Sequence, residues 1–239
     1  MAISDVSTPT SLNLSSTSFN ENINSNSTVA TLSTSGSNSG DSHTYSLVSG
    51  SGDTDNSSFS IDGSSLKINT SPDYETKSSY SVRLKTTNSS GNSYTKAFTV
   101  SVNDINETPT NISLSSSSFD EDYSNGNNSS SGYEKIVATL STTDVDSSDT
   151  HTYSLVSGSG DTDNNYFQIG GSSNNQLKFW GTANYEAKSS YNIRLQTTDN
   201  NGNSYSKAFT LSVNDLDIEA NNIVIPTVVS APGSSQYNL

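Results

Sequence analysis

The feature that most constrains the fold is an internal repeat. The segment Thr44–Asn56 recurs almost unchanged as Thr152–Asn164, at an offset of 108 residues. Farther along, Lys96–Thr99 recurs as Lys207–Thr210. Self-similarity at a nearly fixed offset indicates that one structural unit is used twice in tandem. The chain therefore has to fold as two copies of the same architecture.

The offset also predicts the domain boundaries. We expect a first repeat at 1–107, a second repeat at 108–219 and a C-terminal tail at 220–239. Each repeat then has the usual size of a single domain. The second repeat contains an additional Ser-, Asn- and Gly-rich stretch, Tyr123–Tyr133, which a surface turn tolerates well.

Each repeat contains short apolar runs at the spacing of strands in a β-sandwich. In one run Tyr80, Val82 and Leu84 alternate with polar residues, which predicts a strand with one buried and one wet face. No stretch has a helical period. We predict an all-β fold of two tandem seven-stranded Greek-key β-sandwiches. In the first repeat the strands are expected near Ser11–Ser15, Thr28–Thr34, His43–Ser49, Ser58–Ile61, Ser65–Ile68, Tyr80–Thr87 and Ser93–Val102.

The charge of the chain excludes several classes of partner. The net charge is -14 and the pI is about 4.2, so nucleic acid and anionic membrane are not expected partners. No apolar run has transmembrane length. The first residues, Met1–Asp5, lack the basic and apolar regions of a signal peptide. There is no cysteine for a disulfide or a thiolate metal site. The composition instead suits a protein that collects cations.

Acidic residues concentrate at one end of each repeat. When strands alternate in direction, the turns after the odd-numbered strands share one end and the turns after the even-numbered strands share the other. In the first repeat the acids follow odd-numbered strands, and in the second they follow even-numbered strands. The linker between those ends adds three oxygen-bearing side chains. We therefore expect these groups to converge on the junction between the repeats: Glu21, Asp73, Glu75, Asp104, Asn106, Glu107, Thr108, Asp144, Asp146 and Asp199.

Such a cluster repels itself unless cations neutralise it, and the chain has only 10 lysines and arginines. Hard oxygen ligands without histidine or cysteine favour calcium. The alternative is that polar turns are acidic in any acidic protein. The distribution of the acids argues against that alternative. At the opposite end of the first repeat, where this sequence is expected to form no junction with another repeat, the positions equivalent to Asp144, Asp146 and Asp199 are Gly36, Asn38 and Asn88.

These residues together resemble the cadherin-repeat family in its bacterial cadherin-like form. The linker Val102–Pro109 is similar to the V-x-D-x-N-D-N-x-P signature of that family. Asp144–Asp146 resembles its D-x-D motif, Asp73–Glu75 resembles its D-R-E motif, and Phe19–Glu21 resembles its first-strand acidic motif. The resemblance covers nearly everything before residue 220. It implies immunoglobulin-like, cadherin-like sandwiches with calcium between successive repeats, which makes the array rigid.

The sequence also departs from the family pattern. Glu107 replaces the second Asp of the linker signature, and Thr108 replaces its last Asn. At the far end of the second repeat, Asn184 stands where the first repeat has Asp73, and no proline follows the acids. The remaining acids there, Glu121, Glu186, Asp215 and Asp217, are expected to form half a site that a third domain would complete.

We predict a calcium-dependent structural or adhesive module of a bacterial cell-surface or secreted protein. Its partners would be calcium ions, with homophilic contacts or surface glycans as further candidates. With two histidines, no cysteine and no phosphate-binding loop, the chain has no catalytic constellation, and we expect no enzyme activity. The loop Gly50–Asp55 resembles a calcium loop but lacks the required period and the distal Glu, so a polar turn is the better interpretation.

Two other functions remain open. The apolar segment Ile223–Val229 in the tail is interpreted as the opening strand of a further domain or as packing on the second repeat. It also allows a filament subunit that adds this strand to a neighbouring sheet. The other alternative is a carbohydrate-binding module, for which Trp180 is the candidate stacking residue. A single Trp in a strand is more often part of the core or its rim.

Overall fold

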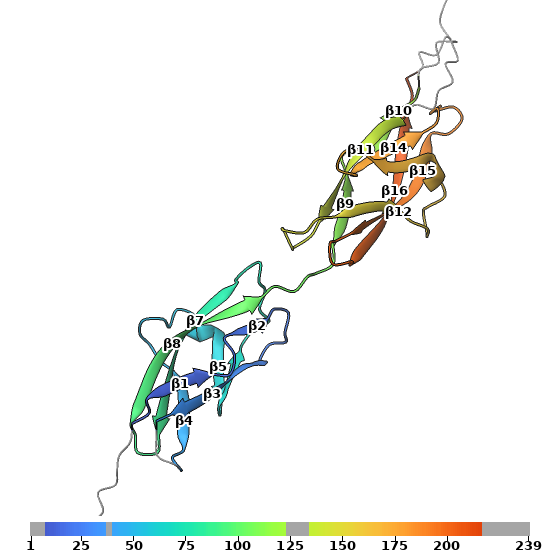
Figure 1. Cartoon of the computed structure of the whole chain (residues 1–239). Helices are drawn as coiled ribbons and strands as arrows, with labels where there is room; N and C mark the ends of the chain where they lie inside the picture. Colours follow the sequence, from blue (N-terminus) through green and yellow to red (C-terminus); the bar gives the residue numbers. More distant parts are fainter. Residues whose placement is uncertain (1–7, 37–39, 123–133, 217–239) are drawn as a thin grey trace, which may run out of the picture. The chain divides into compact units, whose positions relative to one another are not determined.

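The computed structural model describes residues 8–36, 40–122 and 134–216, and its fold is all-β, as predicted (Figure 1). The chain divides into two compact units. Unit 1 comprises Met1–Thr108 together with Asp144–Asp149, and unit 2 comprises Pro109–Thr143 together with Thr150–Leu239. The repeat boundaries at 107 and 219 stay a prediction. The additional stretch at 123–133, the tail at 220–239, Asp217 and Asn38 lie outside the described residues.

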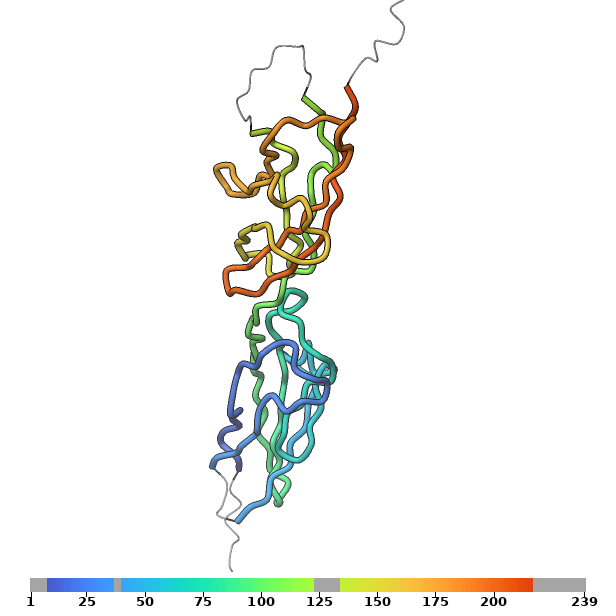
Figure 2. The backbone as a smooth tube through the Cα atoms, turned by 90° about the vertical axis from the view of Figure 1, so that its right-hand side faces the viewer, coloured from blue at the N-terminus to red at the C-terminus, as the bar shows by residue number. Residues whose placement is uncertain are grey.

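Unit 1 is a sandwich of two four-stranded sheets, with the strand orders β1-β3-β6-β5 and β2-β8-β7-β4. All but one of its neighbouring strand pairs are antiparallel, β2 and β8 being the parallel pair. Figure 2 follows the chain through each sandwich. The strands are β1 (Ser11–Leu14), β2 (Ser18–Asn20), β3 (Thr28–Ser35), β4 (His43–Leu47), β5 (Phe59–Asp62), β6 (Ser65–Ile68), β7 (Ser79–Asn88) and β8 (Ser93–Asn103).

The short strand β2 is the main difference from the seven predicted strands. After β1 the chain turns at Ser16, whose hydroxyl donates to the Ser18 carbonyl at 2.6 Å and accepts the Ser18 N–H at 3.2 Å. This turn moves the chain from one sheet to the other. There β2 pairs in parallel with β8, with Phe19 opposite Val102. Glu21 follows β2 directly, so this sheet switch sets its position.

Unit 2 repeats this architecture, with the strand orders β13-β14-β11-β9 and β10-β16-β15-β12. A single 3-10 turn precedes the fifth strand of each repeat, at Asn56–Ser58 and Asn164–Tyr166. The strands of the second repeat are β9 (Asn111–Leu114), β10 (Ser118–Asp120), β11 (Glu134–Thr143), β12 (Thr152–Leu155), β13 (Phe167–Gly170), β14 (Gln176–Trp180), β15 (Ser190–Thr198) and β16 (Ser204–Asn214).

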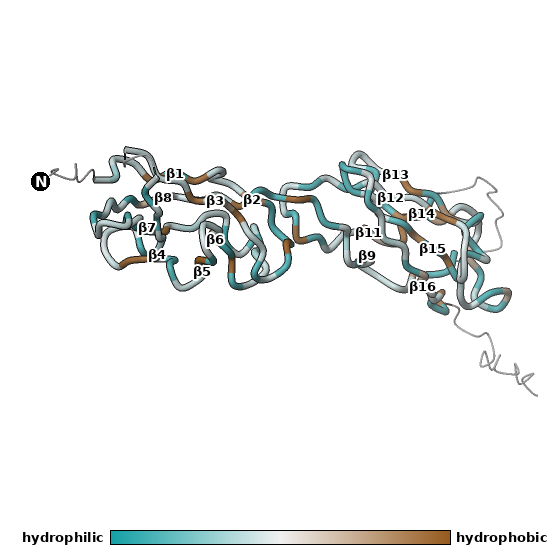
Figure 3. The backbone as a smooth tube through the Cα atoms, turned by 90° about the horizontal axis from the view of Figure 1, so that it is seen from below, coloured by the Kyte–Doolittle hydropathy of each residue, from teal (hydrophilic) through white to brown (hydrophobic). Residues whose placement is uncertain are grey.

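Each unit has its own hydrophobic core between its two sheets. The alternation in β7 is confirmed, because Tyr80, Val82 and Leu84 are all buried. Hydrophobic segments lie within the strands, whereas most connecting turns are polar (Figure 3). A register shift between Thr28 and Ala30 in β3 allows the consecutive residues Val29 and Ala30 both to face inward. These separate cores allow each sandwich to fold without the other.

Among residues 8–36, 40–122 and 134–216, no helix combines the length and apolarity that crossing a membrane requires.

Candidate metal centre

Glu21 organises the acidic end of unit 1. Its side chain is only 3% exposed. One carboxylate oxygen, Oε2, accepts the Tyr74 N–H at 2.8 Å, and the other, Oε1, accepts the Ile105 N–H at 2.8 Å. This one carboxylate therefore fixes both the loop before β7 and the linker after β8. Each of its oxygens keeps a lone pair for a further partner.

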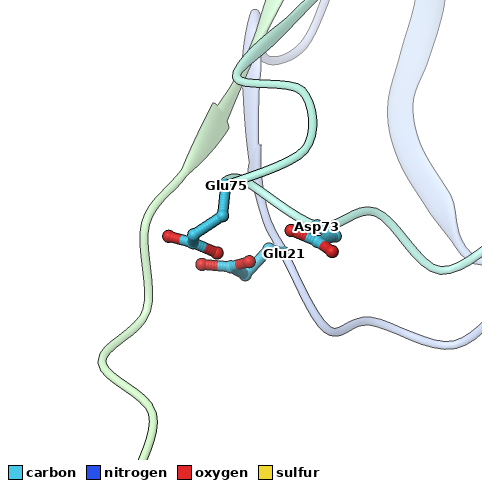
Figure 4. Close-up of side chains that lie close together, drawn as sticks. All are labelled: Glu21, Asp73 and Glu75. Atoms are coloured by element: carbon cyan, nitrogen blue, oxygen red, sulfur yellow. The ribbon is translucent and has the colours of Figure 1, made fainter. Parts of the chain in front are cut away.

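The first acidic cluster consists of Glu21, Asp73 and Glu75, whose ligand oxygens lie within 4.8 Å of one another. Figure 4 shows the carboxylates of Glu21 and Glu75 close together, with Asp73 beside Glu21. Asp73 also accepts the Thr76 N–H at 3.0 Å and the Thr76 hydroxyl at 2.9 Å. These two hydrogen bonds favour the charged form and lower the pKa of Asp73.

The second cluster consists of Glu75, Asp104 and Asp146, again with ligand oxygens within 4.8 Å of one another. Asp146 lies in the segment that is grouped with unit 1 and is only 6% exposed. Its Oδ2 accepts the Glu107 N–H at 2.7 Å. Its Oδ1 is buried and has no hydrogen-bond partner. Burying a carboxylate oxygen without a hydrogen-bond donor costs free energy, so a bound ligand at this oxygen would stabilise the fold.

Glu107 is the second group with an unsatisfied buried oxygen. Its Oε1 accepts a hydrogen bond from the Asn22 side-chain amide, whereas its Oε2 is buried without a partner. Asn106 supports the linker by donating from Nδ2 to the Glu107 carbonyl at 2.8 Å. Thr108 is exposed at the end of the linker. Asn22 was not among the predicted residues, because no local pattern connects it with Glu107.

Three acids at this end of unit 1, Glu75, Asp104 and Glu107, have raised pKa values. Burial, followed by the charges of Glu21, Asp104 and Asp146, raises the pKa of Glu75. Burial, followed by the charges of Asp146 and Glu21, raises the pKa of Asp104. Burial and the charges of Glu21 and Asp146 raise the pKa of Glu107 to about 7. A cation among these groups would remove this mutual repulsion.

A hollow of about 590 Å³ lies beside the second cluster. Its lining includes the three clustered acids and three serines. The lining residues are Tyr74, Glu75, Ser78, Asp104, Val145, Asp146, Ser147 and Ser148. This space leaves room for water to complete the coordination of an ion.

Two further acids of the Asp144–Asp149 segment belong to this region. The Asp146 N–H donates to Asp144 Oδ1 at 3.4 Å, so Asp144 contributes to the shape of the loop. The charge of Asp149 contributes to raising the pKa of Asp104. Asp149 was not predicted as a site residue. Its place in the same short acidic loop is the signal that would have found it.

Asp199 lies in a turn of unit 2. It is buried, and its Oδ1 accepts the Asn201 N–H at 2.9 Å and the Asn203 N–H at 2.8 Å. In unit 1, Asn88 Oδ1 accepts the N–H groups two and four residues later in the same way. An amide oxygen therefore suffices for this turn. The negative charge of Asp199 is therefore not needed to fold the turn. A role for Asp199 as a metal ligand stays a prediction.

Unit 2 carries an acidic cluster of its own, formed by Glu121, Glu186 and Asp215 within 4.8 Å of one another. Glu121 has the same anchoring role as Glu21. It accepts the Tyr185 N–H at 2.9 Å and the Leu216 N–H at 2.8 Å. Three of the four acids predicted for this half-site are thus close together, and Asp217 lies outside the described residues.

The chemistry of unit 1 fits a hard divalent cation. Its two clusters consist of carboxylates alone, and they share Glu75. Calcium binds oxygen ligands at about 2.3–2.6 Å, so oxygens on opposite sides of one ion lie about as far apart as those in each cluster. The partnerless oxygens of Asp146 and Glu107 are acceptors that such an ion would satisfy.

Comparison with known proteins gives the fold. No protein-family model and no curated protein sequence matches the chain. Among solved structures, the protocadherin gamma B4 extracellular domain is 23% identical, with a TM-score of 0.57, over 90% of this chain and 33% of that one. Extracellular cadherin domains 3–6 of protocadherin gamma B2 are 18% identical, with a TM-score of 0.58, over 86% of this chain and 48% of that one.

The chain thus spans a third to a half of the length of those two solved chains. A two-repeat fragment, EC1-2 of human protocadherin-24, is 17% identical, with a TM-score of 0.60, over 85% of this chain and 99% of that fragment. These likenesses agree with the two sandwiches described above, each made of two four-stranded sheets. The chain therefore has the fold of cadherin-like repeats.

Proposed function

We propose that this chain is a calcium-dependent structural or adhesive module of a bacterial cell-surface or secreted protein. In this proposal calcium binds the predicted ligands around Glu75, Asp104 and Asp146 and stiffens the two repeats into a rod. The candidate partners are calcium, further copies of the module and surface glycans. The cadherin-like fold supports an adhesive extracellular role.

One observation carries the proposal. Asp146 comes from the second repeat of the sequence, yet its buried carboxylate lies with those of Glu75 and Asp104, which come from the first. One of its oxygens has no hydrogen-bond partner. Without a cation, the buried Asp146 would lie beside two further carboxylates with no positive group of the cluster to neutralise them. A bound ion gives this arrangement a physical reason.

The expected calcium affinity favours an extracellular location for the module. Sites in extracellular calcium modules typically bind at about 10⁻⁴–10⁻³ M, which suits tissue fluid or seawater rather than cytosol. Calcium that binds only the ordered cluster stabilises it by mass action. The module would therefore be stiff outside a cell and compliant wherever free calcium is scarce.

Small-angle scattering with a calcium titration tests the mechanical part of the proposal. We expect the maximum dimension to become longer and better defined with calcium, and the distance distribution to broaden in EDTA. Circular dichroism should show both sandwiches still folded in EDTA, because each unit has its own core. Identical scattering curves with calcium and with EDTA would contradict the stiffening mechanism. An equal titration with magnesium is the control for simple charge screening.

Calcium affinity should depend on pH, because Glu107 has a pKa of about 7 without metal and must lose its proton to bind an ion. We expect affinity measured by calorimetry to weaken as pH falls from about 7.5 to about 5. In EDTA, the folding stability of the protein should change with pH in the opposite direction to the calcium affinity. The raised pKa means that the folded state holds more protons, so stability should fall as pH rises from the ordinary value of 4.5 toward 7. A pH-independent affinity would argue against Glu107 as a ligand.

A further inference from the structure

The outer face of the sheet β13-β14-β11-β9 carries a large exposed aromatic side chain. Trp180, the only tryptophan of the chain, is 53% exposed at the end of β14, so of the two bland interpretations, core or rim, the core is wrong. Its neighbour Phe179 faces the core and is 1% exposed. Ile136, which is 57% exposed, lies on β11, the strand beside β14 (Figure 1). In the register of β11 and β14, Trp180 lies opposite Glu134 and Ile136 lies opposite Lys178, so both apolar residues belong to the outer face of the sheet.

The sandwich itself does not require this tryptophan. The two repeats align here, with Leu66–Ile68 of β6 matching Leu177–Phe179 of β14. The first repeat therefore has Asn69 at the position of Trp180. It likewise has Thr28, opposite Lys67, where the second repeat has Ile136, opposite Lys178. The same fold forms in the first repeat with polar residues at both positions. The apolar pair is thus a property of the second repeat alone.

Three polar side chains beside Trp180 in the sheet register contact one another. Glu134 lies directly opposite Trp180 in the register of β11 and β14. Its carboxylate forms an ion pair with Lys178 at 2.7 Å and accepts a hydrogen bond from the Gln168 side-chain amide. The bond from Lys178 is the main cause that lowers the pKa of Glu134, which keeps the carboxylate charged. Spare acceptor capacity on Glu134 and Gln168 and spare N–H groups on Lys178 remain for a ligand.

We propose that this face binds a neutral sugar chain of β-linked glucose units through stacking on Trp180. A pyranose ring whose substituents are all equatorial presents only C–H groups on its faces, which match the apolar face of an indole. Its hydroxyls, each both donor and acceptor, lie at the ring edge, where Glu134, Gln168 and Lys178 offer both kinds of partner.

The same polar groups disfavour other occupants. A protein partner covering Trp180 would also strip water from the Glu134–Lys178 pair, and burying an ion pair costs more than it returns unless new hydrogen bonds replace the water. Sugar hydroxyls supply those bonds. A polyanionic chain would meet Glu134 and the net charge of -14. The ligand chemistry that fits is therefore neutral, hydroxyl-rich and flat.

The single tryptophan makes the site directly observable, because all indole fluorescence of the protein comes from Trp180. Titration with cellohexaose is expected to shift the emission to shorter wavelength and to saturate at millimolar concentrations. The Glu134→Gln variant keeps the fluorophore and should bind about threefold more weakly or worse. Trp180→Asn introduces the residue that the first repeat already uses. In calorimetry it should lose about tenfold or more in affinity, whereas Asn69→Ala should change nothing.

The outcomes separate this proposal from the calcium proposal. The titration should give the same affinity in calcium and in EDTA, because the acidic clusters do not include this face. No fluorescence change at tens of millimolar cellohexaose, or equal binding by Trp180→Asn in calorimetry, would overturn the sugar site. Light scattering that shows a wild-type dimer lost in Trp180→Asn would instead make this face a contact between copies, and would also overturn it.

Discussion

Replacing Asp146 with asparagine is expected to abolish the calcium response while leaving the metal-free protein at least as stable as wild type. Asparagine keeps the size of the side chain, and its carbonyl oxygen can still accept the Glu107 N–H that Asp146 accepts at 2.7 Å. Its amide would place N–H donors at the position of the partnerless Oδ1, in a side chain that clusters with the carboxylates of Glu75 and Asp104. The variant thus loses a negative ligand and gains neutral contacts.

The size of the effect follows from mass action. At a calcium concentration about one hundred times the Kd, wild type should gain about 2.7 kcal/mol. For a domain of this size that gain corresponds to a rise in Tm of roughly 10 °C. Thermal unfolding followed by circular dichroism, with calcium and with EDTA, should show this rise in wild type and none in Asp146→Asn.

Asp62→Asn is the matched control for Asp146→Asn. It removes the same charge from an exposed carboxylate of unit 1 that pairs with Lys67 away from the clusters. Its calcium-induced rise in Tm should equal that of wild type. An unchanged response in Asp146→Asn would remove Asp146 from the ligand set. An equal loss in Asp62→Asn would mean that net charge, rather than a defined site, governs the response.

Replacing Glu21 with glutamine is expected to destabilise the acidic end of unit 1 by about 3 kcal/mol. The buried carboxylate accepts two backbone N–H groups, from Tyr74 and Ile105. A glutamine can accept only one of them, and its NH₂ group then faces the other donor. The loss of the negative charge also relieves repulsion with Glu75, but Glu75 is exposed and its interactions are screened by water. The buried donor–donor contact should therefore dominate.

Hydrogen exchange at single amides measures this prediction. The Tyr74 and Ile105 N–H groups should lose protection in Glu21→Gln while the core amides of β7 keep theirs. Glu121→Gln repeats the experiment inside the same molecule, since Glu121 anchors the Tyr185 and Leu216 N–H groups of unit 2. Unchanged protection of these amides in both variants would show that water replaces the carboxylates at little cost.

Much of the fold was predictable because its signals are local. Tyr80, Val82 and Leu84 alternate with polar residues within one strand, so the period alone identifies β7 and its buried face. The strand β2 was missed for the opposite reason. Three residues are too few for a period, and the partner of Phe19 is Val102, more than eighty residues away. Pairing at that distance is a tertiary property that no short window of sequence contains.

In the candidate site, too, local features were predictable from the sequence and contacts between distant residues were not. Strand direction alone predicts that Glu21, Glu75 and Asp104 share one end of a sandwich, and they do. The sequence does not reveal that Glu21 is buried or that its two carboxylate oxygens accept hydrogen bonds from two backbone N–H groups. Both partners lie more than fifty residues away in the sequence. Nor does it reveal the exposure of Trp180. An alternating strand has two faces, and only the packed sheets show that this residue continues the outer one.

The parallel pairing of β2 with β8 has a mechanical consequence for unit 1. These strands lie near the beginning and the end of the unit, and Ser18–Asn20 is in register with Ser101–Asn103. Pulling the two ends of the unit apart would slide the strands past each other along their length. All the hydrogen bonds between them would then carry the force together instead of opening one after another. This shear geometry predicts that unit 1 resists tension applied at its two ends.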